Sequence, residues 1–226
     1  MPFHVYFASN WKDSVNDQRI LPAQYGFGFT ESGALRLPEK LLPNALRIID
    51  DAILPKAMPD AAVLRDLAQQ CSKGCFFDFE RAPTQMHTAI IRSLSRELNA
   101  IPLLVAAERF APLCTSVLPI VAPPPRCTNW RSFASQTAAR YPKGWVLELI
   151  PNAYSVQMPF SAQSSGRLQD ALCCYRQTGK TIRYFDTYET LSQKLTLVQE
   201  YACRAAIGLL KELQPLLQGA HRAYPF

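Results

Sequence analysis

The chain has 226 residues, of which 48% are hydrophobic and 19% are charged, with 18 prolines and only 9 glycines. This balance excludes an extended disordered chain, which lacks the apolar surface needed to offset its ordering entropy, and it excludes a collagen-like or glycine-linker protein. The 24 basic and 18 acidic residues leave a net charge of +6, but the basic residues are scattered, so the charge does not indicate a nucleic-acid partner.

Eight short apolar runs predict β-strands, and they recur along the whole chain. They cover residues 5–7, 25–29, 46–49, 75–79, 103–107, 117–121, 145–150 and 205–210.

Helical periodicity separates several of these runs. Apolar residues recur every three or four positions in 61–71 and again in 84–99, where Thr84 is in place to cap the helix. Near the chain end, Asp186 and Glu189 have the spacing of a capping box and predict the start of a third helix.

Two stretches interrupt the alternation of strand and helix. Residues 122–125 read Ala-Pro-Pro-Pro, which cannot donate ladder hydrogen bonds and so ends a strand in a stiff loop. Residues 173–185 predict a β-hairpin whose turn, at 177–180, contains Gly179.

Alternating strands and helices predict an α/β protein with a parallel sheet. Eight strands in 226 residues favour a compact (β/α)8 TIM-like barrel, with the hairpin as a small insertion near the seventh strand. Because no linker or internal repeat is found, we expect a single domain over residues 1–226.

The seven cysteines and the N-terminal sequence indicate the compartment. An odd cysteine count without a signal peptide predicts reduced thiols in the cytoplasm. No apolar run reaches the ~18 residues that span a bilayer, so no membrane partner is expected. The cysteine spacings do not fit a zinc site, and the three histidines are too scattered for a histidine-based one, so no metal and no cofactor are expected. The oligomeric state stays open.

The most informative stretch ends in two acids, Asp78 and Glu80. Residues two apart on a strand point to the same side, and these two would lie near the C-terminal end, where barrel enzymes place catalytic groups. Two close carboxylates repel each other, so one can keep its proton as a general acid while the other is charged.

This stretch resembles the fourth-strand signature Asp-x-x-Asp-x-Asp-x-Glu of family 18 glycoside hydrolases, the chitinase-like barrels. The last Asp and the Glu are matched by Asp78 and Glu80, whereas Lys73 and Phe76 occupy the first two Asp positions. The resemblance implies that Glu80 protonates the glycosidic oxygen. It also implies that Asp78 orients the substrate's N-acetyl group, whose oxygen attacks the anomeric carbon, so that no protein nucleophile is needed.

The C-terminal third resembles the same family, in particular its spore-germination and cortex-lytic type. Residues 144–154 are similar to a strand that leads into a Pro-x-Tyr loop, and residues 206–213 are similar to the last strand. The family carries a Trp on that last strand, where this chain has Leu209 or Leu210, and a Met-x-Tyr on the sixth strand, where residues 117–121 contain no Tyr. These departures remove a stacking floor and a hydrogen-bond donor for the reacting sugar.

Further acids, aromatics and one amide lie where strands are predicted to end, and they are candidates for saccharide binding. A turn or cap at Asp50 and its neighbour Asp51, salt bridges at the two glutamates, and packing of the aromatics, Trp130 included, remain the structural alternatives. The substrate-binding candidates are Asp50, Glu108, Glu148, Tyr154, Trp11 and Asn10.

Three hypotheses follow. The leading one is a glycoside-hydrolase-like protein that acts on or binds an N-acetylated saccharide, with Glu80 as general acid and Asp78 as assisting carboxylate. The second is a catalytically inactive barrel that serves as a carbohydrate-binding or scaffold protein. The third is a barrel enzyme of different chemistry that uses Asp50, Glu108 or Glu148.

Overall fold

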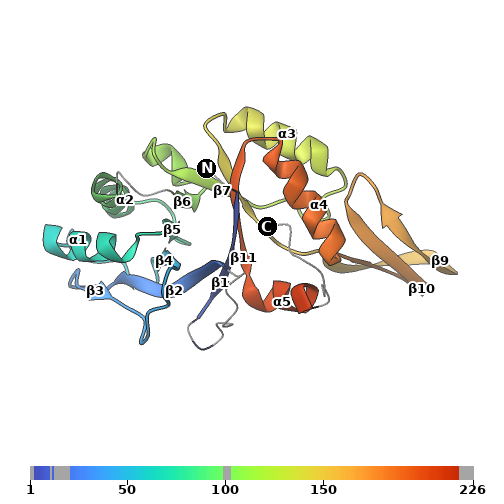
Figure 1. The fold of residues 1–226 in the computed structure, drawn as a ribbon, viewed down its shortest axis with the longest axis horizontal. Helices are drawn as coiled ribbons and strands as arrows, with labels where there is room; N and C mark the ends of the chain where they lie inside the picture. Colours follow the sequence, from blue (N-terminus) through green and yellow to red (C-terminus); the bar gives the residue numbers. More distant parts are fainter. Residues whose placement is uncertain (1–2, 11, 13–20, 99–102, 219–226) are drawn as a thin grey trace. The chain divides into compact units, whose positions relative to one another are not determined.

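The computed structural model describes residues 3–10, 12, 21–98 and 103–218, and Figure 1 shows their elements in sequence colours. The chain forms two compact units. One comprises Val5–Val121, and the other comprises Ala122–Phe226 together with Met1–His4. We call them the N-terminal and the C-terminal unit. The expectation of a single domain over 1–226 stays a prediction.

The N-terminal unit is built on a parallel sheet. Six of its described strands pair in parallel in the order β1-β2-β4-β5-β6-β7, and the short strand β3 (Leu35–Arg36) adds to β2 in the antiparallel sense. The parallel strands are β1 (His4–Ser9), β2 (Leu21–Phe29), β4 (Leu46–Asp50), β5 (Cys75–Asp78), β6 (Leu104–Ala107) and β7 (Leu118–Val121).

Two amphipathic helices cover one face of this sheet (Figure 1). They are α1 (Ala61–Gln70) and α2 (Gln85–Glu97), and a short 3-10 helix, η2 (Ala111–Leu113), follows β6. Leu67 of α1 and Leu94 of α2 are fully buried in one apolar cluster with Phe77 of β5. The strand residues in this cluster alternate with residues that face the other side of the sheet, as the two-residue period of a strand requires.

The C-terminal unit contains the remaining two strands of the parallel set, β8 (Trp145–Glu148) and β11 (Cys203–Leu209), which pair with each other in parallel. Three helices accompany them, α3 (Trp130–Arg140), α4 (Tyr188–Gln199) and α5 (Leu210–Gln218). All eight predicted strands are therefore present in the described residues, and the predicted helices over 61–71 and 84–99 are confirmed as α1 and α2. Thr84 caps α2 as expected, because its hydroxyl accepts the N–H of His87.

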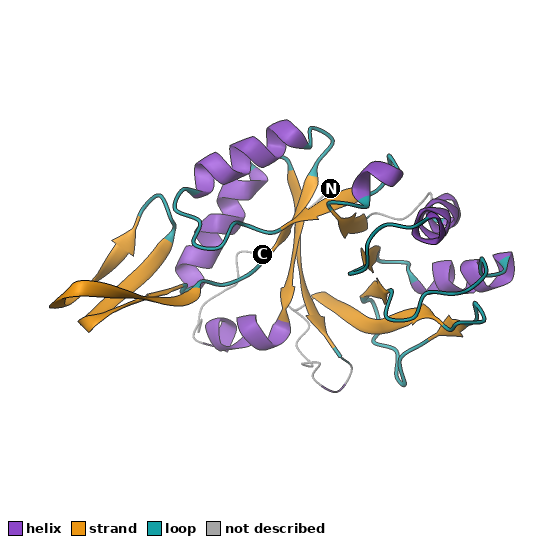
Figure 2. Cartoon of the chain, turned by 180° about the vertical axis from the view of Figure 1, so that it is seen from behind, coloured by secondary structure: helices purple, strands orange, loops and turns teal. Residues whose placement is uncertain are grey.

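A long antiparallel hairpin follows β8, as Figure 2 shows. It consists of β9 (Ala153–Leu168) and β10 (Cys173–Phe185). Its place near the seventh strand is as expected, but the predicted turn at 177–180 is wrong. Cys173 to Phe185 is one strand, and the chain reverses before it, in the turn that follows Leu168. Gly179, at φ +61°, lies at a break in the register with β9 instead of in a turn.

The predicted start of α4 is also wrong. Thr187 caps the helix and exchanges hydrogen bonds with Thr190, whereas Asp186 is buried and binds Lys194 through both carboxylate oxygens at 2.6 and 2.7 Å. The helix begins after Thr187 because the Asp186 carboxylate is already occupied by that buried lysine. Among the described residues, no helix is both long and apolar enough to cross a membrane.

Candidate functional site

The C-terminal ends of β4, β5 and β6 bring several of the predicted acids together in the N-terminal unit. Asp50, the last residue of β4, is the register partner of Asp78, the last residue of β5. Glu80 lies two residues beyond Asp78, and Glu108 follows β6, the next strand along the sheet. Parallel strands place their carboxyl ends at one edge, so four of the predicted acids share that edge.

The two sides of β5 differ in what they contact. Phe77 and Phe79 pack into the cluster beneath α1 and α2. Asp78, between them, therefore points to the opposite face of the sheet, and its register partner Asp50 lies on that same face. In a (β/α)8 protein the face away from the helices is the one that carries the catalytic groups at its C-terminal end.

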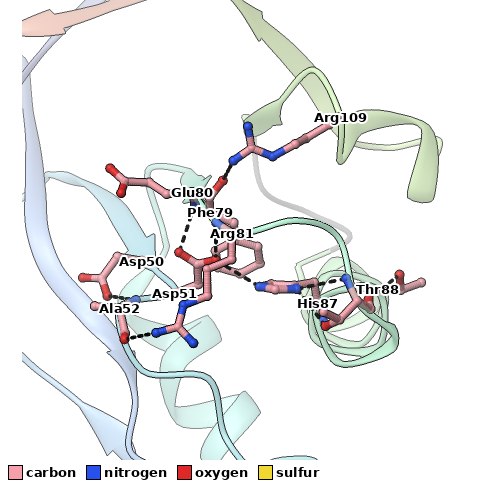
Figure 3. Close-up of polar contacts among 10 residues, drawn as sticks. Asp50, Asp51, Ala52, Phe79, Glu80, Arg81, His87, Thr88 and Arg109 are labelled. Carbon is pink, nitrogen blue, oxygen red and sulfur yellow. Dashed lines mark hydrogen bonds and ion pairs between the residues drawn. The ribbon is translucent and has the colours of Figure 1, made fainter.

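Asp51, which follows Asp50, points toward the helices and organises the loop after β5. It is only 4% exposed, and its carboxylate accepts the backbone N–H groups of Glu80 and Arg81, both at 2.9 Å (Figure 3). Burial raises the pKa of the Asp51 carboxyl, but those two N–H groups and the His87 ring outweigh it, and the net pKa is lowered. Asp51 is therefore a charged anchor that fixes the backbone on which Glu80 is carried.

His87 is the third partner of Asp51. Its Nε2 lies 3.1 Å from the carboxylate, and its Nδ1 lies 3.2 Å from the backbone N–H of Thr84. A backbone N–H only donates, so Nδ1 is the acceptor, and Nε2 carries the hydrogen that Asp51 receives. The ring is fully buried between Phe79 and Phe110, with centroid distances of 5.0 and 5.3 Å. The start of α2 is thereby tied to the loop that carries Glu80.

Arginines hold the backbone at the same edge. Arg81 donates to the carbonyl oxygen of Ala52 at 2.7 Å, and Arg109 donates to that of Phe79. Figure 3 shows both guanidinium groups directed at carbonyl oxygens rather than at the Glu80 carboxylate. These contacts stabilise the loops after β4 and β5 and leave Glu80 unneutralised.

The Asp50 carboxylate has two partners of its own. Arg36 of β3 forms an ion pair with its carboxylate, which also accepts the N–H of Ala52 at 3.0 Å. A Cβ at Gly28 would lie 2.5 Å from the Arg36 guanidinium, so a larger residue there would displace the end of this side chain. The bond to Ala52 is the turn contact expected as the structural alternative for Asp50. The ion pair with Arg36 is not predicted from the sequence.

Glu80 itself is exposed. Figure 3 shows its side chain extending away from Asp51, and among the described residues it has neither a hydrogen-bond nor an ion-pair partner for its carboxylate. Asp78 is half-buried. The arrangement can therefore present one accessible carboxyl group on a rigid support, as a general acid requires.

The other predicted binding residues lie elsewhere. Asn10 is exposed just after β1, and Trp11 lies outside the described residues. Glu148 ends β8 in the C-terminal unit, where partial removal from water raises the pKa of its carboxyl and the charge of Glu212 raises it further. Within the described ranges, no three His, Cys, Asp or Glu side chains could hold a metal ion together.

The two aromatic candidates of the C-terminal unit pack against other side chains. Tyr154 was expected in a loop, but β9 begins at Ala153, and the Tyr154 ring stacks on Tyr184 at 4.9 Å. Trp130 is 2% exposed and lies under the Lys194 ammonium, so it is a packing residue.

Two parts of the site are not indicated by the sequence. The three histidines are scattered along the chain, so nothing singles out His87, and Asp51 is distinguished from Asp50 by no local pattern. The one local signal was the place of His87 three residues after the Thr84 cap, which pointed to a helix start rather than to a link with Asp51.

Comparisons with known proteins support the architecture. No family model matches the chain, and no curated protein matches it. Among solved structures, the spore cortex-lytic enzyme SleL of Bacillus cereus is 10% identical with a TM-score of 0.60, over 96% of this chain and 74% of that one. A chitinase from Chromobacterium violaceum is 12% identical with a TM-score of 0.59, over 98% of this chain and 100% of that one.

A GH18 chitinase from Cycas revoluta, whose structure holds (GlcNAc)4, is 10% identical with a TM-score of 0.58, over 96% of this chain and 98% of that one. At these identities the likeness establishes the fold. The chain therefore has the α/β, (β/α)8 TIM-barrel fold of the GH18 chitinases and SleL-type cortex-lytic enzymes, the family that its Asp78-x-Glu80 stretch resembles.

Proposed function

We propose that the protein is a glycoside hydrolase of the chitinase type that acts on an N-acetylated saccharide. The observation that carries this proposal is the accessible Glu80 carboxyl group, held at the C-terminal end of the fourth parallel strand by the two backbone bonds to Asp51. The fold it shares with chitinases, one of them holding (GlcNAc)4, supplies the substrate class.

In this proposal Glu80 gives its proton to the glycosidic oxygen as the bond to the anomeric carbon breaks. The acetamido oxygen of the sugar forms the new bond to that carbon, and Asp78 orients the acetamido group. Water then opens the cyclic intermediate and returns its proton to Glu80, which restores the acid. Glu80 is accessible to solvent, and Asp78, two residues earlier, is half-buried, in keeping with these roles.

Glu80→Gln tests the proposal, because the amide keeps the size of the side chain but cannot donate a proton. We expect hydrolysis of a chromogenic N-acetylglucosamine oligomer to fall by roughly 10²- to 10⁴-fold. Glu97→Gln, at an exposed position on α2, is the matched control and should retain full turnover. Equal turnover in the Glu80→Gln variant and the wild type would remove Glu80 from the mechanism.

A second function is a carbohydrate-binding barrel without turnover. Two observations favour it: β7 contains no Tyr, and at the end of β11, where the resemblance to chitinase-type barrels implies a Trp, the chain has Leu209 or Leu210. Wild-type protein that binds (GlcNAc)4 in calorimetry but does not cleave it on prolonged incubation would establish this function in place of the first.

A further inference from the structure

The C-terminal unit contains a groove of about 600 Å³ that the proposed chemistry does not use. Strand β10 lines it together with residues 151–153 around the start of β9, Asp186, and Glu212 of α5. The β10 side chains that line it are Arg176, Thr178, Thr181, Arg183 and Phe185.

A break in the strand pairing at Gly179 lies between the two arginines of this groove. In a regular strand, Arg176 and Arg183 are an odd number of residues apart and would point to opposite sides. The pairing breaks between Gly179 and Thr181, where two steps of β10 face the five steps of β9 from Ala162 to Gln157, and beyond this break Arg183 lines the same groove as Arg176. The opposite face carries Tyr175 and Tyr184, whose ring centroids are 6.5 Å apart.

The charge of the groove is not balanced from within. Both arginines are exposed, and neither forms an ion pair or hydrogen bond with the described residues. Asp186 lines the groove, but its charge is already neutralised by Lys194 at 2.6 Å. Glu212 is then the remaining acid against two guanidinium groups, so the groove has a net positive charge.

The geometry points to a ligand that is anionic and extended. A guanidinium fork binds a planar carboxylate through two parallel hydrogen bonds. The two arginines are seven positions apart on the strand, a span of at most about 23 Å, so one small anion does not reach both. Thr178 places between them a hydroxyl group that suits the hydroxyls of a sugar, whereas the Thr181 hydroxyl is bonded to the Gln157 amide.

We propose that this groove binds a carboxylate-bearing oligosaccharide, with Arg176 and Arg183 each holding one carboxylate. The anionic character rests on the groove alone, whereas the saccharide rests on the proposed function. The face of the hairpin is thereby assigned to recognition of acidic sugar residues, a task separate from the acid chemistry of Glu80.

Calorimetric titration with tetragalacturonate tests the proposal without any turnover. We expect binding that weakens as salt is raised, and a roughly threefold to tenfold loss of affinity in each of Arg176→Gln and Arg183→Gln. Glu212→Gln should act in the opposite direction and raise affinity roughly twofold to fivefold, because it removes the repelling charge. Arg65→Gln, an equal charge change at an exposed position of α1, should leave affinity unchanged.

Titrations with two other oligosaccharides test whether the carboxylates of the ligand are what the groove recognises. (GlcNAc)4 should bind equally well to the wild type and to the Arg176→Gln/Arg183→Gln double variant, since it has no carboxylate. A heparin tetrasaccharide that binds where tetragalacturonate does not would overturn the carboxylate assignment. Unchanged tetragalacturonate affinity in both arginine variants would overturn the site, while hydrolysis by the wild type would still stand or fall on Glu80.

Discussion

Replacement of Asp51 by Asn tests how the site is supported. The amide has one accepting oxygen, so it cannot accept the N–H of Glu80 on one side and those of Arg81 and His87 on the other. Turned either way, it leaves at least one donor facing its own NH₂ group in a buried place, and it weakens the remaining bonds by removing the charge.

An unsatisfied buried donor costs about 1–3 kcal/mol, and loss of charge assistance adds about 1 kcal/mol, so the N-terminal unit should lose about 2–4 kcal/mol of stability at pH 7. The folded-state pKa of Asp51 lies below its ordinary value. Its stabilising contribution is therefore complete above the unfolded pKa of ~3.9 and is lost as pH falls through the folded value. The difference between wild type and variant should shrink in acid.

Hydrogen exchange resolved by residue is the direct assay, because the Glu80 and Arg81 amides donate to Asp51. Both should exchange faster in Asp51→Asn, and urea denaturation followed by circular dichroism should give the loss of free energy. Asp66→Asn, an exposed change on α1, is the control. Unaltered exchange at both amides, or a stability equal to that of the control, would refute this account of Asp51.

Two further changes probe the C-terminal unit. Lys194→Met leaves the Asp186 carboxylate buried without its ammonium partner, so the free energy of unfolding should fall by about 3–5 kcal/mol, measured by urea denaturation followed by circular dichroism; a loss below about 1 kcal/mol would contradict the buried pair. Glu148→Gln should stabilise the protein at pH 7, because a raised folded-state pKa opposes folding once the group is charged, and the gain should vanish below pH ~4. Thermal melts of Glu148→Gln from pH 3 to 8 check this, and a gain that does not depend on pH would show that charge is not its cause.

The strands could be read from the sequence because each is a local apolar run bounded by turn residues. The apolar run with Phe76 and Phe77 predicts β5 by its composition alone. Thr84 predicts the start of α2, because an N-cap residue hydrogen-bonds to the first turn of the helix that follows it. The turn of the hairpin could not be predicted in this way. Glycine at position 179 suits either a turn or an irregular strand residue, and only the pairing of Arg176 with Ser165 and of Arg183 with Ser155 shows that it lies within a strand.

The sequence likewise indicated the candidate acids at the strand ends, but not which side of the sheet each of them faces. Asp50 and Asp51 are adjacent and chemically identical, yet one faces the Asp78 side of the sheet and the other faces α2. They face opposite sides because adjacent residues of an extended chain point in opposite directions. The five residues of β4 do not indicate which side of the sheet the helices will cover. His87 contacts Asp51 across 36 residues of chain, a separation at which no local pattern carries information.

The sequence by itself determined the eight parallel strands, the helices α1 and α2, the fold class, and the position of the Asp78-x-Glu80 pair at a strand end, because these depend on interactions between near neighbours in the chain. Only the tertiary structure decided that Asp51 and His87 hold the Glu80 loop, that Asp186 is buried against Lys194, and that Arg176 and Arg183 line one groove. Each of these depends on which side chains meet when distant segments pack, and that is fixed by the faces the segments bury.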